Sequence, residues 1–290
     1  MAAREESRGF APSTTKRIGK KKQIRIYIRE IALTIFFSSF ALILYAILKR
    51  FGFSKLLGSS IAFIVAALVV FLLFPRILGI PFGRVDTNEW IRKIGLQPPQ
   101  CVWKHILLGI LLAMCTLFGM LMTSIMTGKY VFDLDNIGPS HMVFSLIPGF
   151  FEELFIRGVL MVILLKITKS LEKAFVIQIV VFGLMHINGI DIVSLVDALS
   201  VSILAISFTY VVYKTRSLIA AIVFHYLHDA FLFLVQLPGG VYQGFSDNAL
   251  FYTGLWVMVG VSILITKLAT ERFRVRAKAP LYEESYSQPM

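Results

Sequence analysis

Cysteine and charged residues are scarce in this chain. Only two of its 290 residues, Cys101 and Cys115, are cysteines, which excludes a disulfide framework and a cysteine-based zinc site. Charged residues make up 16% of the chain and hydrophobic residues 57%, whereas soluble domains carry about 25% charged residues. This composition excludes a sizeable soluble domain and indicates a polytopic membrane protein.

Common catalytic signatures are also missing. The chain has neither the HExxH motif of soluble zinc proteases nor the GxSxG motif of serine hydrolases. Cys115 lies in the middle of an apolar run, and Cys101 lies in a loop far in sequence from other reactive side chains. Serine and cysteine nucleophiles are therefore poor candidates. The sequence also lacks the internal repeat that many transporters show.

The apolar runs predict an all-α, polytopic membrane protein. A spanning helix needs roughly 20 apolar residues, and a lipid-exposed backbone must satisfy its own hydrogen bonds, which favours helices. The runs predict about eight spans. They are Ile31–Leu48, Leu56–Phe74, His105–Thr127, His141–Leu165, Ala174–Asn188, Ile192–Tyr213, Leu218–Leu237 and Ala249–Leu268.

Lysine and arginine predict how these spans are oriented. With about eight spans both termini lie on one side, and 24 of the 29 Lys and Arg residues fall on that side. Positive residues are retained in the cytoplasm, so residues 1–30 and 271–290 are expected to be cytoplasmic tails that flank a membrane domain at 31–270. The formal charge of +12 is thereby explained by topology and anionic lipid headgroups, and no nucleic-acid partner is expected.

Three charges interrupt the apolar run from Val143 to Leu165. Each central charge costs roughly 2.5–3.5 kcal/mol on insertion scales, so Glu152, Glu153 and Arg157 must be paired or used. Glu153 and Arg157 are four residues apart and share one helix face, which predicts a supporting ion pair. Glu152 lies about 100° round the helix and is left as the free carboxylate. The alternative is a single buried network that only holds helices together.

Two later spans carry further polar side chains. His186 lies near the end of one span, and His225 and Asp229 are four residues apart in another. His186 alone is compatible with an interfacial histidine, and His225 with Asp229 alone is compatible with a helix-packing pair. Together with Glu152 they are expected to converge, because unpaired polar groups in hydrocarbon cost several kcal/mol. The side-chain tips of Glu152 and both histidines are expected within roughly 8 Å of one another, close enough for a bridging water. Such a set suits a carboxylate acting as general base on water. The alternative interpretation is that Glu152, His186 and His225 bind a divalent metal such as zinc.

The ordered motifs resemble those of a known family. Glu152-Glu153-Leu154-Phe155-Ile156-Arg157 reads as EExxxR, Phe182–His186 as FxxxH, and His225–Asp229 as an HxxxD form of a motif that usually reads HxxxN. Their order and spacing over about residues 140–235 are similar to the CPBP (Abi) intramembrane proteases, which include the type II CAAX prenyl endopeptidases.

The resemblance implies a catalytic cavity inside the bilayer and hydrolysis of a peptide bond by water. Glu152 would be the base, His186 would help to activate the water, and His225 would lie on the oxyanion side. Glu153 and Arg157 would support them. Asp229 departs from the usual asparagine, whose amide can donate to an oxyanion, and would instead orient His225 or bind a metal.

The resemblance leaves the substrate open between membrane peptides and lipidated proteins, and the cofactor between a metal and none. A non-proteolytic scaffold or regulator with the same fold is the alternative function, and a transporter is a third.

Overall fold

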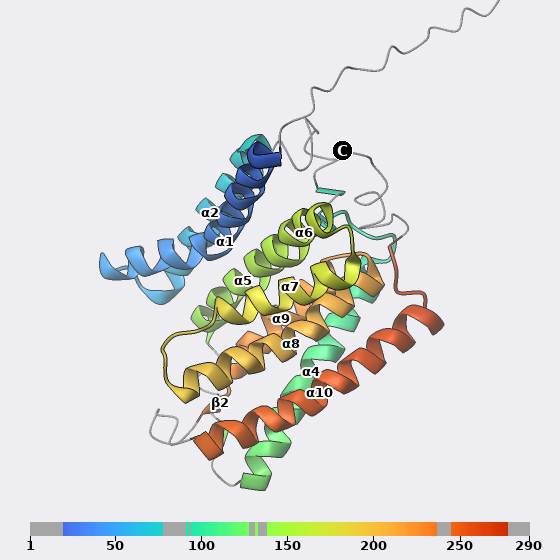
Figure 1. The fold of residues 1–290 in the computed structure, drawn as a ribbon. Coiled ribbons are helices and arrows are strands. Elements are labelled where there is room, and N and C mark those ends of the chain that lie inside the picture. Colours follow the sequence, from blue (N-terminus) through green and yellow to red (C-terminus); the bar gives the residue numbers. More distant parts are fainter. Residues whose placement is uncertain are drawn as a thin grey trace, which may run out of the picture.

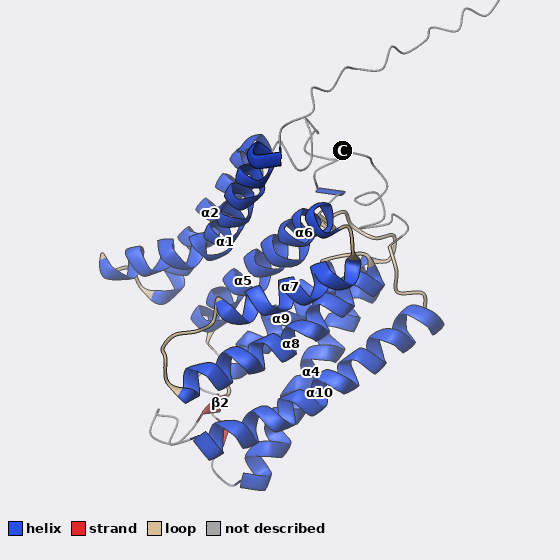
Figure 2. Ribbon diagram, in the orientation of Figure 1, coloured by secondary structure: helices blue, strands red, loops and turns tan. Residues whose placement is uncertain are grey.

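The structure is a computed structural model that describes residues 20–77, 91–92, 94–127, 131–132, 138–236 and 245–277. In these ranges the chain is almost entirely helical (Figures 1 and 2). The helices are α1 (Lys20–Arg50), α2 (Lys55–Ile77), α4 (Val102–Thr127), α5 (Pro139–Glu152), the π-helix η2 (Glu153–Leu160), α6 (Met161–Thr168), α7 (Leu171–Leu184), α8 (Ile192–Thr215), α9 (Ile219–Leu232) and α10 (Phe245–Arg272). Two short strands, β1 (Val131–Phe132) and β2 (Val235–Gln236), pair antiparallel.

The predicted all-α membrane fold is confirmed. Within the described residues, five helices are long and apolar enough to cross a membrane: α1, α2, α4, α8 and α10. Helix α9 is apolar but shorter, and α5, η2 and α6 follow one another without a break. Each of the eight predicted spans overlaps one helical segment, with α7 as the eighth, and the protein is an integral membrane protein.

Some boundaries differ from the predicted ones. Helix α1 begins at Lys20, inside the predicted tail, because a basic, polar first turn is compatible with a helix that only later enters an apolar stretch. Helix α9 ends at Leu232 rather than Leu237. Helix α7 ends at Leu184, so His186 lies just past its end, where a side chain is less constrained by the helix. The remainder of the predicted tails, residues 1–19 and 278–290, lies outside the described residues.

Close helix packing brings the later spans together. Helices α1 and α2 pair with each other and contact α5, which in turn packs against α9 (Figure 1). Gly149 of α5 lies so close to α9 that an added Cβ would be 2.7 Å from the backbone of Tyr226. On the other face of α9, a Cβ on Gly109 of α4 would be 2.7 Å from the carbonyl oxygen of Ala220. Small residues thus hold α9 between α5 and α4, with His225 adjacent in sequence to the Gly149 contact.

Candidate active site

The two glutamates lie where the helix changes its winding. Glu152 is the last residue of α5, and Glu153 is the first residue of the π-helix η2. A π-helix has i→i+5 hydrogen bonds, is rare, and is found frequently at functional sites. All eight residues of η2 are buried, so the altered winding lies inside the bundle.

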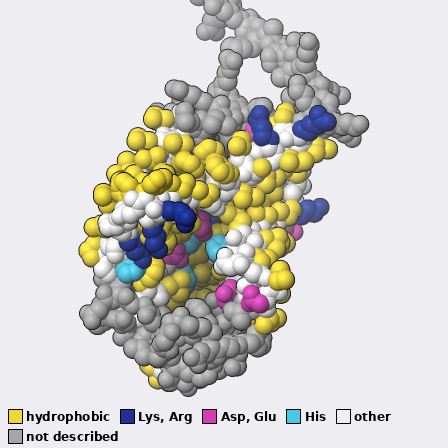
Figure 3. All heavy atoms as spheres, turned by 90° about the vertical axis from the view of Figure 1, so that its left-hand side faces the viewer, with side chains coloured by type: hydrophobic (Ala, Val, Ile, Leu, Met, Phe, Trp, Pro, Cys, Tyr) yellow, Lys and Arg dark blue, Asp and Glu magenta, His cyan; other side chains and the backbone are white. Residues whose placement is uncertain are grey.

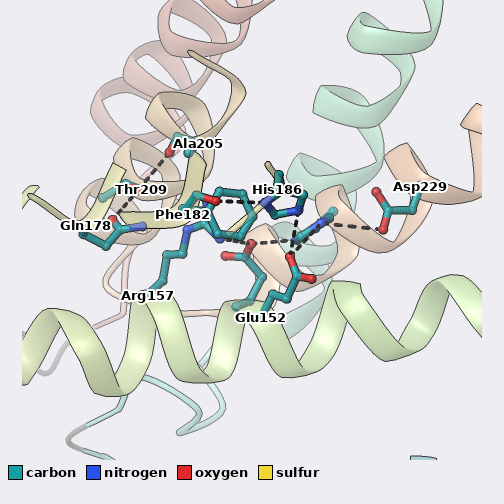
Figure 4. A network of polar contacts seen from close by, with 10 residues as sticks. Glu152, Arg157, Gln178, Phe182, His186, Ala205, Thr209 and Asp229 are labelled. Carbon is teal, nitrogen blue, oxygen red and sulfur yellow. Dashed lines mark hydrogen bonds and ion pairs between the residues drawn. The ribbon is translucent and has the colours of Figure 1, made fainter. Parts of the chain in front are cut away.

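Glu153 and Arg157 form the deepest pair. The carboxylate Oε1 of Glu153 lies 3.0 Å from Nη1 of Arg157, and both side chains are fully buried, so the predicted ion pair is confirmed. The guanidinium carbon of Arg157 also lies 4.0 Å from the ring centroid of Phe182 and 5.2 Å from that of Phe208. Aromatic faces attract a desolvated guanidinium, and this contact further stabilises the buried charge (Figure 4).

The same glutamate oxygen fixes the ring of His225. Nδ1 of His225 lies 2.8 Å from Oε1 of Glu153. A neutral ring that donates its Nδ1–H to this carboxylate carries its lone pair on Nε2. The ring also stacks on Phe208, with centroids 4.7 Å apart and planes 21° apart. His225 is therefore held at two points, with Nε2 left to face the site.

Glu152 lies opposite both histidines. Its Oε2 is 3.9 Å from Nε2 of His225 and 4.0 Å from Nε2 of His186, and this buried oxygen has no hydrogen-bond partner. Nδ1 of His186 lies 2.8 Å from the carbonyl oxygen of Phe182, four residues earlier, so the ring donates from Nδ1 and presents Nε2 to the glutamate. The two imidazoles thus direct equivalent nitrogens at one carboxylate oxygen (Figure 4).

Asp229 completes the group on the open side. Its Oδ2 lies 3.6 Å from Nε2 of His225, as their spacing of four residues predicts. Exposure rises outward: the side chain of Glu152 is 10% exposed, that of Asp229 21% and that of His186 33%. Figure 3 shows a hollow on this face of the molecule, in which acidic and histidine side chains gather inside a largely hydrophobic rim.

The neighbouring His228 does not join this site. It is buried, and its Nδ1 lies 3.3 Å from the hydroxyl oxygen of Thr116 on α4. The hydroxyl of Thr116 donates to the carbonyl oxygen of Ala113 at 2.9 Å, so it accepts from the histidine ring. His228 therefore joins α9 to α4 on the side away from Glu152.

The comparisons with known proteins point to the same segment. Residues 136–231 match the family model described as type II CAAX prenyl endopeptidase Rce1-like. This segment of the chain is therefore similar to the CAAX protease family. This confirms the family resemblance of the sequence motifs. Searches among curated proteins and among solved structures find no match.

The matched segment contains all six side chains predicted for the site, from Glu152 to Asp229. The structure brings them together from α5, η2, the end of α7 and α9. Motif spacing did not indicate Phe208 on α8, which contacts both Arg157 and His225. Nor did it indicate Gln178 on α7, whose amide oxygen accepts from the hydroxyl of Thr209 at 2.7 Å (Figure 4). Their polar or aromatic character in mid-span was the available signal.

The donor atoms around Glu152 are too far apart for a tetrahedral zinc ion. Ligand atoms around a tetrahedral zinc lie roughly 3.4 Å apart, since zinc–nitrogen and zinc–oxygen bonds are about 2.0–2.2 Å. The separations of 3.9 and 4.0 Å between Glu152 and the two histidines would require angles at the ion of roughly 125–155°, wider than the tetrahedral angle of about 109°. Across the described ranges, no group of three or more His, Cys, Asp or Glu side chains is arranged to hold a metal. The zinc reading of Glu152, His186 and His225 is therefore not supported.

Proposed function

We propose that the protein is an intramembrane endopeptidase in which Glu152 activates a water molecule for attack on a peptide bond. The observation that carries this proposal is the placement of Glu152 Oε2, a buried oxygen without a protein hydrogen bond, about equally far from Nε2 of His186 and of His225. Polar atoms about 4 Å apart suit a shared water. A carboxylate that contacts such a water can accept its proton as the water attacks.

The two histidines have different surroundings, which suggests different roles. His225 is fixed by Glu153 and by stacking on Phe208. As the imidazolium it donates from Nδ1 to Glu153 and from Nε2 into the site, and we assign this protonated ring to the side where negative charge develops on the carbonyl oxygen. His186 is the most exposed of the four groups, and we assign it to holding the water and relaying its proton. Asp229 contacts only Nε2 of His225 among these groups, which favours a role in orienting that ring.

The substrate is best sought among peptides that are themselves in the membrane. The exposed surfaces of the candidate spans are rich in large hydrophobic side chains, so a soluble peptide would have to leave water to reach Glu152. A membrane-associated or lipidated peptide is already concentrated in the bilayer. The matched family supports an intramembrane CAAX endopeptidase in general, and we extend this to the present chain as hydrolysis of such a substrate.

We also infer that both termini are cytoplasmic. Of the 29 Lys and Arg residues, 24 fall on the side of the two termini, and the opposite side carries only Lys49, Arg50, Lys55 and Lys129. Positive residues are retained on the cytoplasmic side. A tag at either terminus should be accessible only from the cytoplasmic side of the membrane. Access to the tag from the opposite side would contradict this orientation.

The decisive experiment compares purified wild-type protein with Glu152→Gln and with Glu172→Gln, a control on an exposed glutamate of α7. Each protein is incubated in lipid with membrane peptides, and the fragments are identified by mass spectrometry. General base catalysis contributes typically about 10²–10⁴-fold, so Glu152→Gln should lose at least about 10²-fold in rate while Glu172→Gln is unchanged. Equal cleavage by all three proteins would refute the role of Glu152. Absence of cleavage by folded wild-type protein on lipidated and membrane peptides would favour the scaffold alternative.

A further inference from the structure

The two ends of the helix bundle differ in charge. At one end α6 is followed by α7 and α8 by α9, and we call it the basic end because these connections are rich in Lys and Arg. The basic residues there are Lys166, Lys169, Lys173, Lys214 and Arg216. The α1–α2 and α7–α8 connections lie at the opposite end, on the left of Figure 1. Since positive residues are retained in the cytoplasm, the basic end faces the cytoplasm.

Packed side chains separate Glu152 from the basic end. Residues 151–165 are all buried, so about three turns of buried helix lie between Glu152 and that end. Ile94, which precedes α4, is fully buried, and a Cβ on Gly158 of η2 would lie 3.1 Å from its carbonyl oxygen. The next residue, Gly95, accepts a hydrogen bond from the backbone N–H of Leu218 at 2.9 Å. A peptide that approached Glu152 from the cytoplasm would therefore have to displace packed core residues.

The polar side chains of the site become more exposed toward the opposite end. Both α7 and α9 begin at the basic end, so His186, just past the end of α7, and Asp229, near the end of α9, lie toward the other end. The side chain of Glu153 is fully buried, whereas those of Asp229 and His186 are 21% and 33% exposed. Ile190, in the connection after His186, is completely exposed. Figure 3 views the molecule from this connection's side of Figure 1, and the hollow with its acidic and histidine side chains faces the viewer.

We propose that the active site opens to the side of the membrane opposite the cytoplasm, and that it cuts membrane-anchored peptides in a segment that lies on that side. The inference rests on the proposed function for the hydrolysis and on the cytoplasmic position of the termini for the direction. Hydrolysis adds one water across the peptide bond and yields a new carboxylate and a new amine. Water and the extended segment both reach Glu152 through the hollow, while the apolar anchor of the substrate stays in the bilayer beside the hydrophobic rim. A peptide presented only on the cytoplasmic face is not cut.

Cysteine labelling measures the direction of the opening without any hydrolysis. His186→Cys and Asp229→Cys are made separately in the Cys101→Ser, Cys115→Ser background, and spheroplasts of a bacterial expression host are treated with a charged, membrane-impermeant maleimide. Both site cysteines should be labelled before the membrane is permeabilised. Native Cys101, which is exposed just before α4 and is tested with only Cys115 replaced, should be labelled only afterwards. The two site positions report independently, so misfolding of one variant leaves the measurement intact.

Three labelling results would overturn the proposal. The first is labelling of the site cysteines only after permeabilisation, which would place the opening on the cytoplasmic side. The second is a lack of labelling under both conditions, which would mean that the hollow does not lead to the site. The third is labelling of Cys101 in intact spheroplasts, which would reverse the orientation of the chain. Ile190→Cys, on the completely exposed connection, is the positive control for the reagent.

Two matched reporter libraries test the class of substrate. Both carry the same apolar anchor helix and the same short randomised segment, which lies on the outer side of the membrane in one library and in the cytoplasm in the other. Fragments from cells that also express the protein are identified by mass spectrometry. The wild type should cut the outer library alone, and Glu152→Gln should lose at least about 10²-fold of that rate. Cleavage of the cytoplasmic library, alone or equally with the outer one, would overturn the proposal. Cleavage of neither library by folded wild-type protein would refute the proposed function, and the labelling result decides the direction of the opening separately.

Discussion

Replacement of Glu153 by glutamine should destabilise the protein far more than replacement of Glu152. Glu153 Oε1 lies 3.0 Å from Nη1 of Arg157 and 2.8 Å from Nδ1 of His225, and the glutamate and arginine are fully buried. A glutamine can still accept from His225, but it leaves the buried guanidinium without the carboxylate that neutralises it. Loss of one partner from a buried ion pair costs roughly 3–5 kcal/mol.

The nearest nitrogens to Glu152 lie at 3.9 and 4.0 Å, beyond hydrogen-bond distance. Glu152→Gln should therefore change the free energy of unfolding by less than about 1 kcal/mol, within the usual range for a substitution that breaks no specific contact. Unfolding of both variants by denaturant in identical mixed micelles provides the measurement. A double variant, Glu153→Gln with Arg157→Met, should recover part of the loss, because the uncompensated charge is removed. Equal stability of Glu153→Gln and Glu152→Gln would refute the division between a supporting and a reacting carboxylate.

Further predictions test the chemistry and the packing. Asp229→Asn should keep the fold and change the cleavage rate by less than tenfold if Asp229 only orients His225, as a kinetic assay on any peptide cleaved by the wild type will show; loss of all activity would instead assign the carboxylate a proton-transfer role. The double variant Cys101→Ser, Cys115→Ser should retain activity, and covalent serine- or cysteine-directed inhibitors should not act; a labelled residue whose modification abolishes cleavage would contradict a water nucleophile. Chelators should leave the rate unchanged, since the donor distances do not suit zinc, and inhibition that added zinc reverses would restore the metal reading. Gly149→Ala should cost about 1–3 kcal/mol of stability through overpacking, because its Cβ would lie 2.7 Å from the backbone of Tyr226; Gly260→Ala on α10, where a Cβ would meet nothing within 4 Å, is the control, and equal stability of the two variants would contradict the close packing of α5 on α9.

The order of helices and the polar cluster could both be predicted from the sequence. Apolar runs of bilayer length mark spans because the backbone must be satisfied internally, and each predicted run overlaps an observed helix. The pair between Glu153 and Arg157 follows from a spacing of four residues and is present. The convergence of Glu152 with His186 and His225 followed from the cost of unpaired polar groups.

Contacts between helices were harder to predict, since they depend on how each helix is rotated about its axis. Spacing related His225 to Asp229, but it gave no sign that Nδ1 of His225 bonds to Glu153, 72 residues away in sequence. The stacking of Phe208 on His225 depends in the same way on the rotation of α8. The π-helix from Glu153 to Leu160 has no residue signature, because its longer hydrogen bonds are favoured by surrounding packing rather than by local propensity.

The burial of the three charges indicates which of them is free to act. Each charge in the middle of a span costs roughly 2.5–3.5 kcal/mol to insert, and a pair lowers that cost only if its partners meet. Glu153 and Arg157 meet at 3.0 Å in full burial, so their charges compensate each other and are committed to holding η2 against α7, α8 and α9. Glu152 meets no partner at hydrogen-bond distance. The fold therefore does not offset the cost of burying the Glu152 carboxylate, and the group that does so must be a water molecule or part of a substrate. This is the physical reason to assign the chemistry to Glu152 and the support to Glu153, although the two are neighbours in the sequence.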